Sequence, residues 1–285
     1  MTDNIFTFTG KSTLNNASMY KAMTIAGSDT SGGAGMEADL KTFEEMGVYG
    51  MAAVTCIVAQ EPASWNHDIF PIELGVIQKQ LATILDGIGI NALKTGMLGS
   101  AELVELIAQT IDKYHLKNVV IDPVMVCKGI ETIMVPEAAA TIKELLVKRA
   151  DVITPNLLEA AYLADMEQID SLAAMREAAG KINALGAKYV VLKAGDRLPG
   201  AEAIDLVYDG KDFLTLTSPK ITDAFNHGAG CTFSACLTAN LAKGSDIHEA
   251  MRITKNFMQA ALTGSFRLNQ FGGATCHYAW RNQTK

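Results

Sequence analysis

The sequence predicts an α/β fold in which helices cover both faces of a mostly parallel central sheet. From Tyr20 onward, short apolar runs typical of buried strands alternate with segments whose apolar residues recur at helical spacing. Parallel strands require such crossovers, so the alternation favours a parallel sheet. Only residues 203–217 depart from this alternation of strands and helices, because Asp209-Gly210 between two segments of alternating hydrophobicity is a hairpin signal.

The predicted elements follow one another in a regular order. The first strand is the run KAMTIAG, and the helix after it has Met36, Leu40 and Phe43 on one face and ends at Gly47. Similar apolar runs predict strands over residues 21–27, 51–59, 91–96, 118–123, 151–156 and 189–195. Helical spacing predicts helices over residues 36–47, 76–87, 101–114, 138–149, 171–186, 229–243 and 246–263.

The chain is expected to form a single domain over residues 19–285. Its 285 residues are 49% hydrophobic, enough for one large core, and no internal repeat or long linker interrupts them. Residues 1–18 are rich in Asn, Ser and Thr and are followed directly by Met19. We expect this stretch to be a flexible leader or tag.

Composition excludes several classes of function. A net charge of -7 argues against a nucleic-acid-binding protein, which would carry a basic stripe. No apolar run reaches the roughly 18 residues that a membrane-spanning helix needs. The 5 cysteines include no Cys-x-x-Cys pair, which suits free thiols in a reducing cytoplasm better than a disulfide frame or a zinc site.

The segment NHGAGC predicts an anion-binding helix start. Ligands of open α/β sheets bind at the carboxyl ends of strands, where this sequence places polar, Gly and Pro residues. The backbone N–H groups of Ala229, Gly230 and Cys231 would converge on an anion such as a transferring phosphate. A helix N-terminus also lowers the pKa of a thiol, so Cys231 could accept a proton from a substrate hydroxyl. The alternative is a small-residue packing turn with an inert thiol.

A second glycine-rich loop, GSDTSGGAGMEAD, follows the first strand. Residues 33–38 fit the dinucleotide fingerprint G-x-G-x-x-A, but the acidic residue expected at the end of the next strand is absent there. The other interpretation is a loop that holds a small polar ligand, with Asp39 facing it from the first helical turn.

Three oxygen-bearing side chains at neighbouring strand ends predict a magnesium site. Asp122 ends one strand, while Asn156 and Glu159 follow the next and share a helix face. This donor set, with few carboxylates, suits water-rich Mg²⁺ held near a nucleotide phosphate. Lys193, at a further strand end, could reach the same phosphate.

Together these segments resemble the ribokinase superfamily, and more narrowly its vitamin kinases: the hydroxymethylpyrimidine (phosphate) kinases and the similar bacterial pyridoxal kinases. The resemblance covers residues 20 to 282 in order. It rests on the segments AGSDTSGGAGMEADLKTFEEMGVYGM, KTGMLGS, DPVMVCKG, TPNLLEA and HGAGCTFSA. It implies a three-layer α/β/α, ribokinase-like fold, Mg²⁺ with ATP as phosphoryl donor and a homodimer, and it allows a monovalent cation.

The resemblance also assigns roles to individual residues. It makes Gly228, Ala229 and Gly230 the anion hole, Cys231 the base, and Glu159, with Asn156, the residue that organises Mg²⁺. The strand-end pattern described above adds Asp122 as a metal-binding residue. The substrate side comprises Gly27, Asp39, Gln60, His67, Met97 and Cys127, of which Cys127 would close over the substrate and add to its aldehyde. The ATP side comprises Asn156, Lys193, Gly195 and His227.

The expected reaction is phosphorylation of the hydroxymethyl group of pyridoxal, giving pyridoxal 5'-phosphate. The pyridoxal kinases are resembled in three segments, MVCKG, SWNH and LNQFGGATCHYA. In addition, only an aldehyde gives the Cys127 thiol a group to which it can add reversibly. Gln60 instead favours a pyrimidine, so the alternative or second activity is the hydroxymethylpyrimidine/phosphomethylpyrimidine kinase of thiamin biosynthesis. A Rossmann dehydrogenase and a non-catalytic vitamin-binding protein are further alternatives, but neither explains why N-x-x-E and GAGC occur together.

Overall fold

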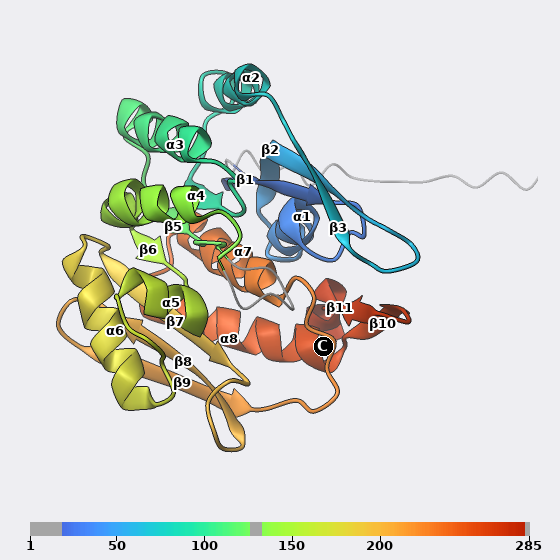
Figure 1. The fold of residues 1–285 in the computed structure, drawn as a ribbon, viewed down its shortest axis with the longest axis vertical. Coiled ribbons are helices and arrows are strands. Elements are labelled where there is room, and N and C mark those ends of the chain that lie inside the picture. Colours follow the sequence, from blue (N-terminus) through green and yellow to red (C-terminus); the bar gives the residue numbers. More distant parts are fainter. Residues whose placement is uncertain (1–18, 126–132, 283–285) are drawn as a thin grey trace, which may run out of the picture.

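The computed structural model describes residues 19–125 and 133–282, and these form an α/β fold around one large sheet (Figure 1). The sheet has 9 strands in the order β3-β2-β1-β4-β5-β6-β7-β8-β9. Neighbouring strands from β2 to β7 are parallel, whereas β3, β8 and β9 are antiparallel to their neighbours. The strands are β1 (Lys21–Asp29), β2 (Tyr49–Gln60), β3 (His67–Pro71), β4 (Ala92–Thr95), β5 (Val119–Ile121), β6 (Val152–Ile153), β7 (Tyr189–Gly195), β8 (Glu202–Tyr208) and β9 (Phe213–Pro219).

Helices cover both faces of this sheet, which confirms the predicted three-layer architecture. One face carries α2 (Leu74–Leu85), α3 (Ala101–Tyr114), α4 (Pro136–Thr141), which continues through the π-helical turn η1 (Ile142–Leu146) into the 3₁₀ turn η2 (Val147–Arg149), α5 (Leu157–Leu163) and α6 (Leu172–Ala184). The other face carries α1 (Gly35–Glu45), α7 (Ala229–Ala242) and α8 (Ile247–Thr263). The chain ends with the small sheet of β10 (Phe266–Asn269) and β11 (Gly272–Ala274) and the 3₁₀ turn η3 (His277–Asn282).

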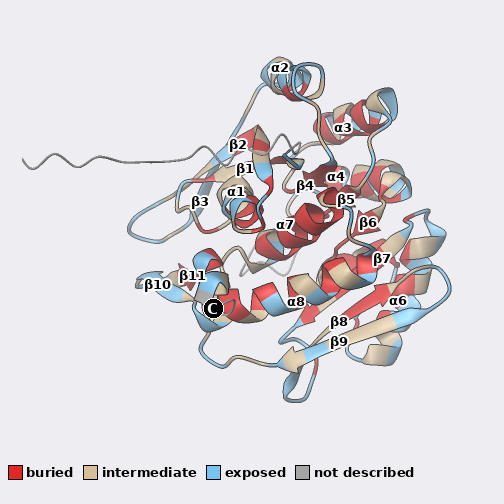
Figure 2. Cartoon of the chain, turned by 180° about the vertical axis from the view of Figure 1, so that it is seen from behind, coloured by how far each residue is buried: buried red, intermediate tan, exposed pale blue. Residues whose placement is uncertain are grey.

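The core is divided between the two faces of the sheet. On the face of α7, Phe43 and Phe257 are fully buried together with most of α7 itself (Figure 2). Burying a side chain of this size contributes about 1.5–3 kcal/mol. Because α7 is packed along almost its whole length, its first residues are held in a fixed position.

Most predicted elements are present, and the differences are local. The hairpin expected over residues 203–217 is formed by β8 and β9. The helix predicted over residues 138–149 begins earlier, with Pro136 in its first turn, where a missing N–H costs nothing. The strands β3, β10 and β11 were not predicted. No helix in the described ranges is long and apolar enough to cross a membrane.

Candidate active site

A large cavity lies at the carboxyl ends of the parallel strands. It has a volume of about 440 Å³ and is bordered by the start of α7, the ends of β5 to β7 and one side of α8. It brings together many of the residues predicted from the sequence, namely His67, Asp122, Asn156, Glu159, Lys193, Gly195, His227, Gly228, Ala229, Gly230 and Cys231.

The turn over residues 228–231, called the GAGC turn below, requires glycine at its first position. Gly228 has a φ of 79°, in the left-handed region that favours glycine. A Cβ on Gly228 would also overlap the carbonyl oxygen of Gly33 in the β1–α1 loop. The turn is therefore packed directly against that loop.

Two of the three N–H groups expected to bind an anion are free to do so. The Ala229 N–H donates to the Asn226 carbonyl at 3.1 Å, so the prediction was wrong for this group. In the described part of the chain, the N–H groups of Gly230 and Cys231 have no acceptor. Both lie at the cavity, where the helix dipole favours negative charge.

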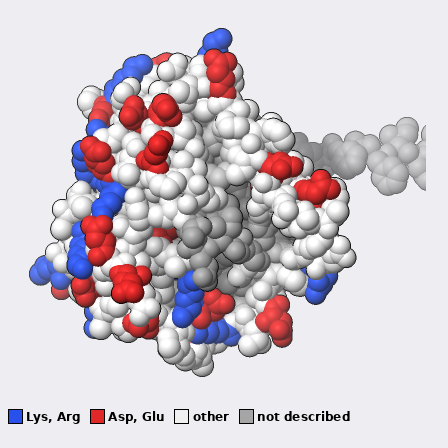
Figure 3. All heavy atoms as spheres, in the orientation of Figure 1, with Lys and Arg blue, Asp and Glu red and all other residues white. Residues whose placement is uncertain are grey.

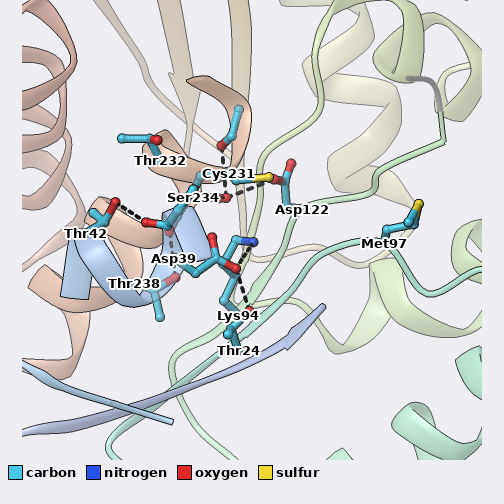
Figure 4. A network of polar contacts seen from close by, with 12 residues as sticks. Thr24, Asp39, Thr42, Lys94, Met97, Asp122, Cys231, Thr232, Ser234 and Thr238 are labelled. Carbon is cyan, nitrogen blue, oxygen red and sulfur yellow. Dashed lines mark hydrogen bonds and ion pairs between the residues drawn. The ribbon is translucent and has the colours of Figure 1, made fainter. Parts of the chain in front are cut away.

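The surroundings of Cys231 oppose ionisation of its thiol (Figure 4). Burial raises the pKa of Cys231 to about 12, and the carboxylates of Asp39 and Asp122 add to the increase. The Lys94 ammonium and the Gly35 N–H lower this pKa but do not outweigh the burial. The prediction that the helix N-terminus lowers the thiol pKa is therefore wrong for the free site, because burial and two carboxylates dominate.

Lys94 belongs to a buried ion pair that the motif analysis missed. Its Nζ lies 2.8 Å from Asp39 Oδ2, which also accepts from Thr24 Oγ1 at 2.6 Å. Burial raises the pKa of Asp39 despite the neighbouring Lys94. Both side chains of the pair are fully buried, so the Asp39 carboxylate lies in the interior and not at the cavity surface, where contact with the substrate was expected. A lysine inside NALKTG, a segment predicted to be a strand of the central sheet, is the signal that could have revealed the pair.

Asp122 is the centre of a second polar cluster. Its Oδ1 lies 3.0 Å from Lys193 Nζ and 3.3 Å from Thr154 Oγ1, and its Oδ2 accepts from Ser234 Oγ at 2.9 Å. A Cβ on Gly230 would lie 3.8 Å from Lys193 Nζ. The lysine therefore stands beside the GAGC turn, where it adds positive charge to the anion site.

Asn156 and Glu159 start α5 with a capping box. Asn156 Oδ1 accepts from the N–H of Glu159 at 3.0 Å, and Glu159 Oε2 accepts from the N–H of Asn156 at 2.9 Å. Glu159 Oε1 also accepts from the Met125 N–H at 3.3 Å. Burial raises the pKa of Glu159 to about 7, Lys193 lowers it and Asp122 raises it further.

This donor set fits magnesium held mainly through water. In the described ranges, no three histidine, cysteine or carboxylate side chains converge into a protein-only metal site. Asp122 and Glu159 both line the cavity, and Asp122 repels the Glu159 carboxylate, although the attraction of Lys193 for this carboxylate is larger. A divalent cation between them and a bound phosphate would remove that repulsion.

The residues predicted for the substrate lie in two places. Gly27 packs against Met97 and Cys56, because a Cβ on it would lie 3.3 Å from Met97 Cε and 2.7 Å from Cys56 Sγ. Met97 and Cys56 line an adjoining apolar cavity of about 360 Å³. His67 begins β3 and borders the main cavity. Cys127 lies outside the described residues.

Gln60 and His227, which were assigned to different substrates, meet at one carboxylate. Gln60 Nε2 donates to Asp29 Oδ1 at 2.7 Å, and His227 Nε2 lies 2.7 Å from Asp29 Oδ2. Asp29 was not among the predicted site residues. Its place at the end of the first strand, in the segment GSD, is the signal that could have identified it.

Known proteins resemble the chain over nearly its whole length. A pyridoxine kinase of Bacillus subtilis is 54% identical over 265 residues, covering 93% of this chain and 98% of the relative. A hydroxymethylpyrimidine/phosphomethylpyrimidine kinase of the same organism is 40% identical over 267 residues, covering 94% and 98%. The crystal structure of an ADP complex of Bacillus subtilis pyridoxal kinase superposes with a TM-score of 0.90 at 54% identity, covering 93% of this chain and 99% of that one.

The family model described as phosphomethylpyrimidine kinase matches residues 29–276. The match includes the β1–α1 loop, Asn156, Glu159 and the GAGC turn, on which the resemblance was based. That resemblance is confirmed, and the chain belongs to the phosphomethylpyrimidine kinase family.

Proposed function

We propose that this chain transfers the γ-phosphoryl group of ATP to the hydroxymethyl group of pyridoxal. The observation that carries the proposal is one cavity that contains an anion site, a thiol, a lysine and two carboxylates. Phosphoryl transfer needs positioning and charge stabilisation, which this set can supply. The 54% identity to a pyridoxine kinase supports a B6 vitamer as acceptor.

The anion hole is assigned to the N–H groups of Gly230 and Cys231. They belong to residues at the start of α7 that line the cavity, and Lys193 stands beside them. Charge on the transferred group would therefore meet two amide dipoles and one ammonium. Fixed dipoles of this kind stabilise a transition state without reorganising during the reaction.

Cys231 is proposed as the group that accepts the hydroxyl proton. The thiol is protonated in the free site near neutral pH, since burial raises its pKa to about 12. Lys94 is the neighbouring cation that favours the thiolate. The reaction should therefore become faster as the pH rises and more of the thiolate forms.

Asp122 and Glu159 would hold Mg²⁺ that accompanies ATP, through the water-rich arrangement described above. The cation would supply charge neutralisation on the phosphates. The chain's own contribution is to keep both carboxylates oriented, Asp122 by Ser234 and Glu159 by the capping box.

The second candidate is phosphorylation of a hydroxymethylpyrimidine. The family description and the 40% identity to a hydroxymethylpyrimidine/phosphomethylpyrimidine kinase favour it. The two acceptors share a hydroxymethyl group on a small nitrogen-containing ring, so one site can serve both.

The test is conversion of pyridoxal to pyridoxal 5'-phosphate by purified protein with Mg²⁺ and ATP, followed by chromatography. Cys231→Ala is the matched control, because it removes the proposed base and leaves the backbone of the turn. Product formation that stops with this variant supports the proposal. A protein that forms no phosphorylated B6 vitamer contradicts it.

A further inference from the structure

The Asp29 carboxylate joins three segments that lie far apart in the chain. Within its own loop it accepts from the Ser31 N–H at 2.9 Å and the Ala34 N–H at 2.8 Å. From the end of β2 it accepts from Gln60 Nε2 at 2.7 Å. From the turn before α7 it pairs with His227 Nε2 at 2.7 Å.

These hydrogen bonds are shielded from solvent, and the group that accepts them is charged. Asp29 is only 6% exposed. Burial tends to raise its pKa, but the hydrogen bonds from His227, Ser31 and Gln60 and the charge of His227 outweigh burial and hold this pKa well below its ordinary value. Asp29 is therefore ionised at every working pH and can only accept hydrogen bonds. It follows that both Gln60 and His227 present an N–H to it.

The two loops also touch directly, so a change at Asp29 would be transmitted to the GAGC turn. A Cβ on Gly33 would overlap the His227 ring, and one on Gly228 would overlap the Gly33 carbonyl. His227 comes immediately before Gly228, and its N–H and carbonyl bond to the backbone of Gly273 and Thr275 at 3.3 Å each. A movement of the GAGC turn therefore requires a movement of His227.

The same carboxylate sets the direction of the Gln60 amide. Because Asp29 takes the Nε2 group, Oε1 is left as the acceptor of the Gln60 amide, and among the described residues no donor bonds to it. The amide would then accept a hydrogen bond from a donor on the substrate ring, such as a ring N–H or an amino group.

We propose that Asp29 is a positioning residue that couples the acceptor side of the site, through Gln60, to the phosphate side, through His227 and the GAGC turn. It orients both groups without touching either substrate. This inference rests on the proposed kinase function and deepens it. In this proposal His227 holds the anion hole in place, whereas the resemblance placed it among the nucleotide-binding residues.

The experiment compares Asp29→Asn, His227→Ala and His227→Gln with Thr30→Ala, in the full chain. Thr30 is exposed in the same loop, and within the described ranges its side chain makes no hydrogen bond, which makes it a matched control. Turnover and KM are measured with the acceptor, pyridoxal or hydroxymethylpyrimidine, that the wild type phosphorylates faster. The comparison of the variants therefore does not depend on which of the two compounds is the better acceptor.

We expect Asp29→Asn and His227→Ala to lower kcat by about ten- to a hundredfold, as a displacement of about 1 Å can do. Asp29→Asn should also raise KM for the acceptor, since the Gln60 amide is released. His227→Gln keeps an N–H near the position of Nε2 and should recover most of kcat. The double variant Asp29→Asn/His227→Ala should be no slower than the worse single variant, because both remove the same coupling.

A second readout does not depend on turnover. The ¹⁵N NMR spectrum of wild-type protein should show a protonated His227 Nε2, identified by its absence in His227→Gln and shifted in Asp29→Asn. If this proton is missing, the pairing is wrong even in an active enzyme. If the pairing is present but Asp29→Asn has wild-type kcat and KM, or if the single effects simply add, the positioning role is wrong.

Discussion

Cys231 illustrates how a residue's neighbours override its local motif. The helix start favours a thiolate, yet burial and the carboxylates of Asp39 and Asp122 raise the thiol pKa to about 12. The sequence could identify Cys231 because it follows a glycine turn. It could not reveal the pKa, which depends on residues brought close only by the fold.

The base assignment predicts the effect of two substitutions at Cys231. Cys231→Ala should lower kcat by about 10²–10⁴-fold, the usual contribution of a general base. Cys231→Asp replaces the thiol by a carboxyl group, whose ordinary pKa is about 3.9 instead of about 8.5, so its kcat/KM should reach its maximum at a lower pH than that of wild type. Steady-state kinetics between pH 6 and 9 measures both effects, and near-normal turnover of Cys231→Ala would exclude this residue as base.

Lys94 should matter for both stability and turnover. Lys94→Met leaves Asp39 buried and unpaired, and loss of one partner of such a pair destabilises a protein by about 3–5 kcal/mol. Lys94→Met/Asp39→Leu removes the whole pair and should recover most of that stability in urea unfolding. Its turnover should stay low, because the cation near Cys231 is gone. Full recovery of turnover in the double variant would show that the pair is only structural.

The elements that could be predicted are those whose residue pattern reflects burial. The central strands are continuous apolar runs, and α3 and α8 have one clearly apolar face. β3 was missed because all five of its residues are exposed, so the alternation of a half-buried strand is absent. β10 and β11 were missed because strands of 4 and 3 residues carry too little pattern.

The start of α7 offers a test at the level of one element. Gly228→Ala introduces a Cβ at positive φ, which costs about 1–2 kcal/mol even without its overlap with Gly33. Gly230→Ala meets only ordinary contact with Lys193 Nζ at 3.8 Å. We expect Gly228→Ala to lower both Tm and kcat, and Gly230→Ala to lower kcat alone by placing a methyl group in the anion site. Unchanged kcat in Gly230→Ala would argue against an anion hole at this turn.

The C-terminal turn η3 should make stability depend on pH. Burial lowers the pKa of His277 to about 4 from an ordinary value of 6.5, with a further decrease from Lys41. Between these values the unfolded chain binds a proton that the folded chain excludes, so the free energy of unfolding falls as the pH drops. The loss approaches about 3 kcal/mol near pH 4.

Urea unfolding of wild type and His277→Gln at pH 7 and pH 4.5 measures this contribution. The variant cannot titrate at this position, so it should lose less stability on acidification than wild type. Equal losses in the two proteins would show that His277 is not held neutral by the fold.

At the scale of the whole molecule, the expected homodimer remains a prediction. The edge strand β3 exposes Ile69 and Phe70, and Ile57 on β2 is exposed beside them. An apolar edge of this kind is usually covered in a native protein. Light scattering should give the mass of a dimer for wild type and of a monomer for Phe70→Lys, and a monomeric wild type at assay concentration would contradict the prediction.

The net charge and the family of the protein could also be predicted from the whole sequence. On the face shown in Figure 3, acidic and basic side chains are interspersed. The family followed from five motifs at strand ends, of which four contribute residues to the main cavity, whereas KTGMLGS lines the adjoining apolar cavity. The sequence favoured pyridoxal and left a hydroxymethylpyrimidine as the alternative, but it could not reveal the bond between Gln60 and Asp29, which forms only when distant segments fold together.

The most direct test of the central claim is a competition between acceptors. Wild-type protein, Mg²⁺ and ATP are incubated with equal concentrations of pyridoxal and 4-amino-5-hydroxymethyl-2-methylpyrimidine, and both phosphorylated products are quantified by mass spectrometry. The ratio of initial rates gives the ratio of kcat/KM. We predict an excess of pyridoxal 5'-phosphate, whereas an excess of the pyrimidine phosphate would contradict the B6 assignment.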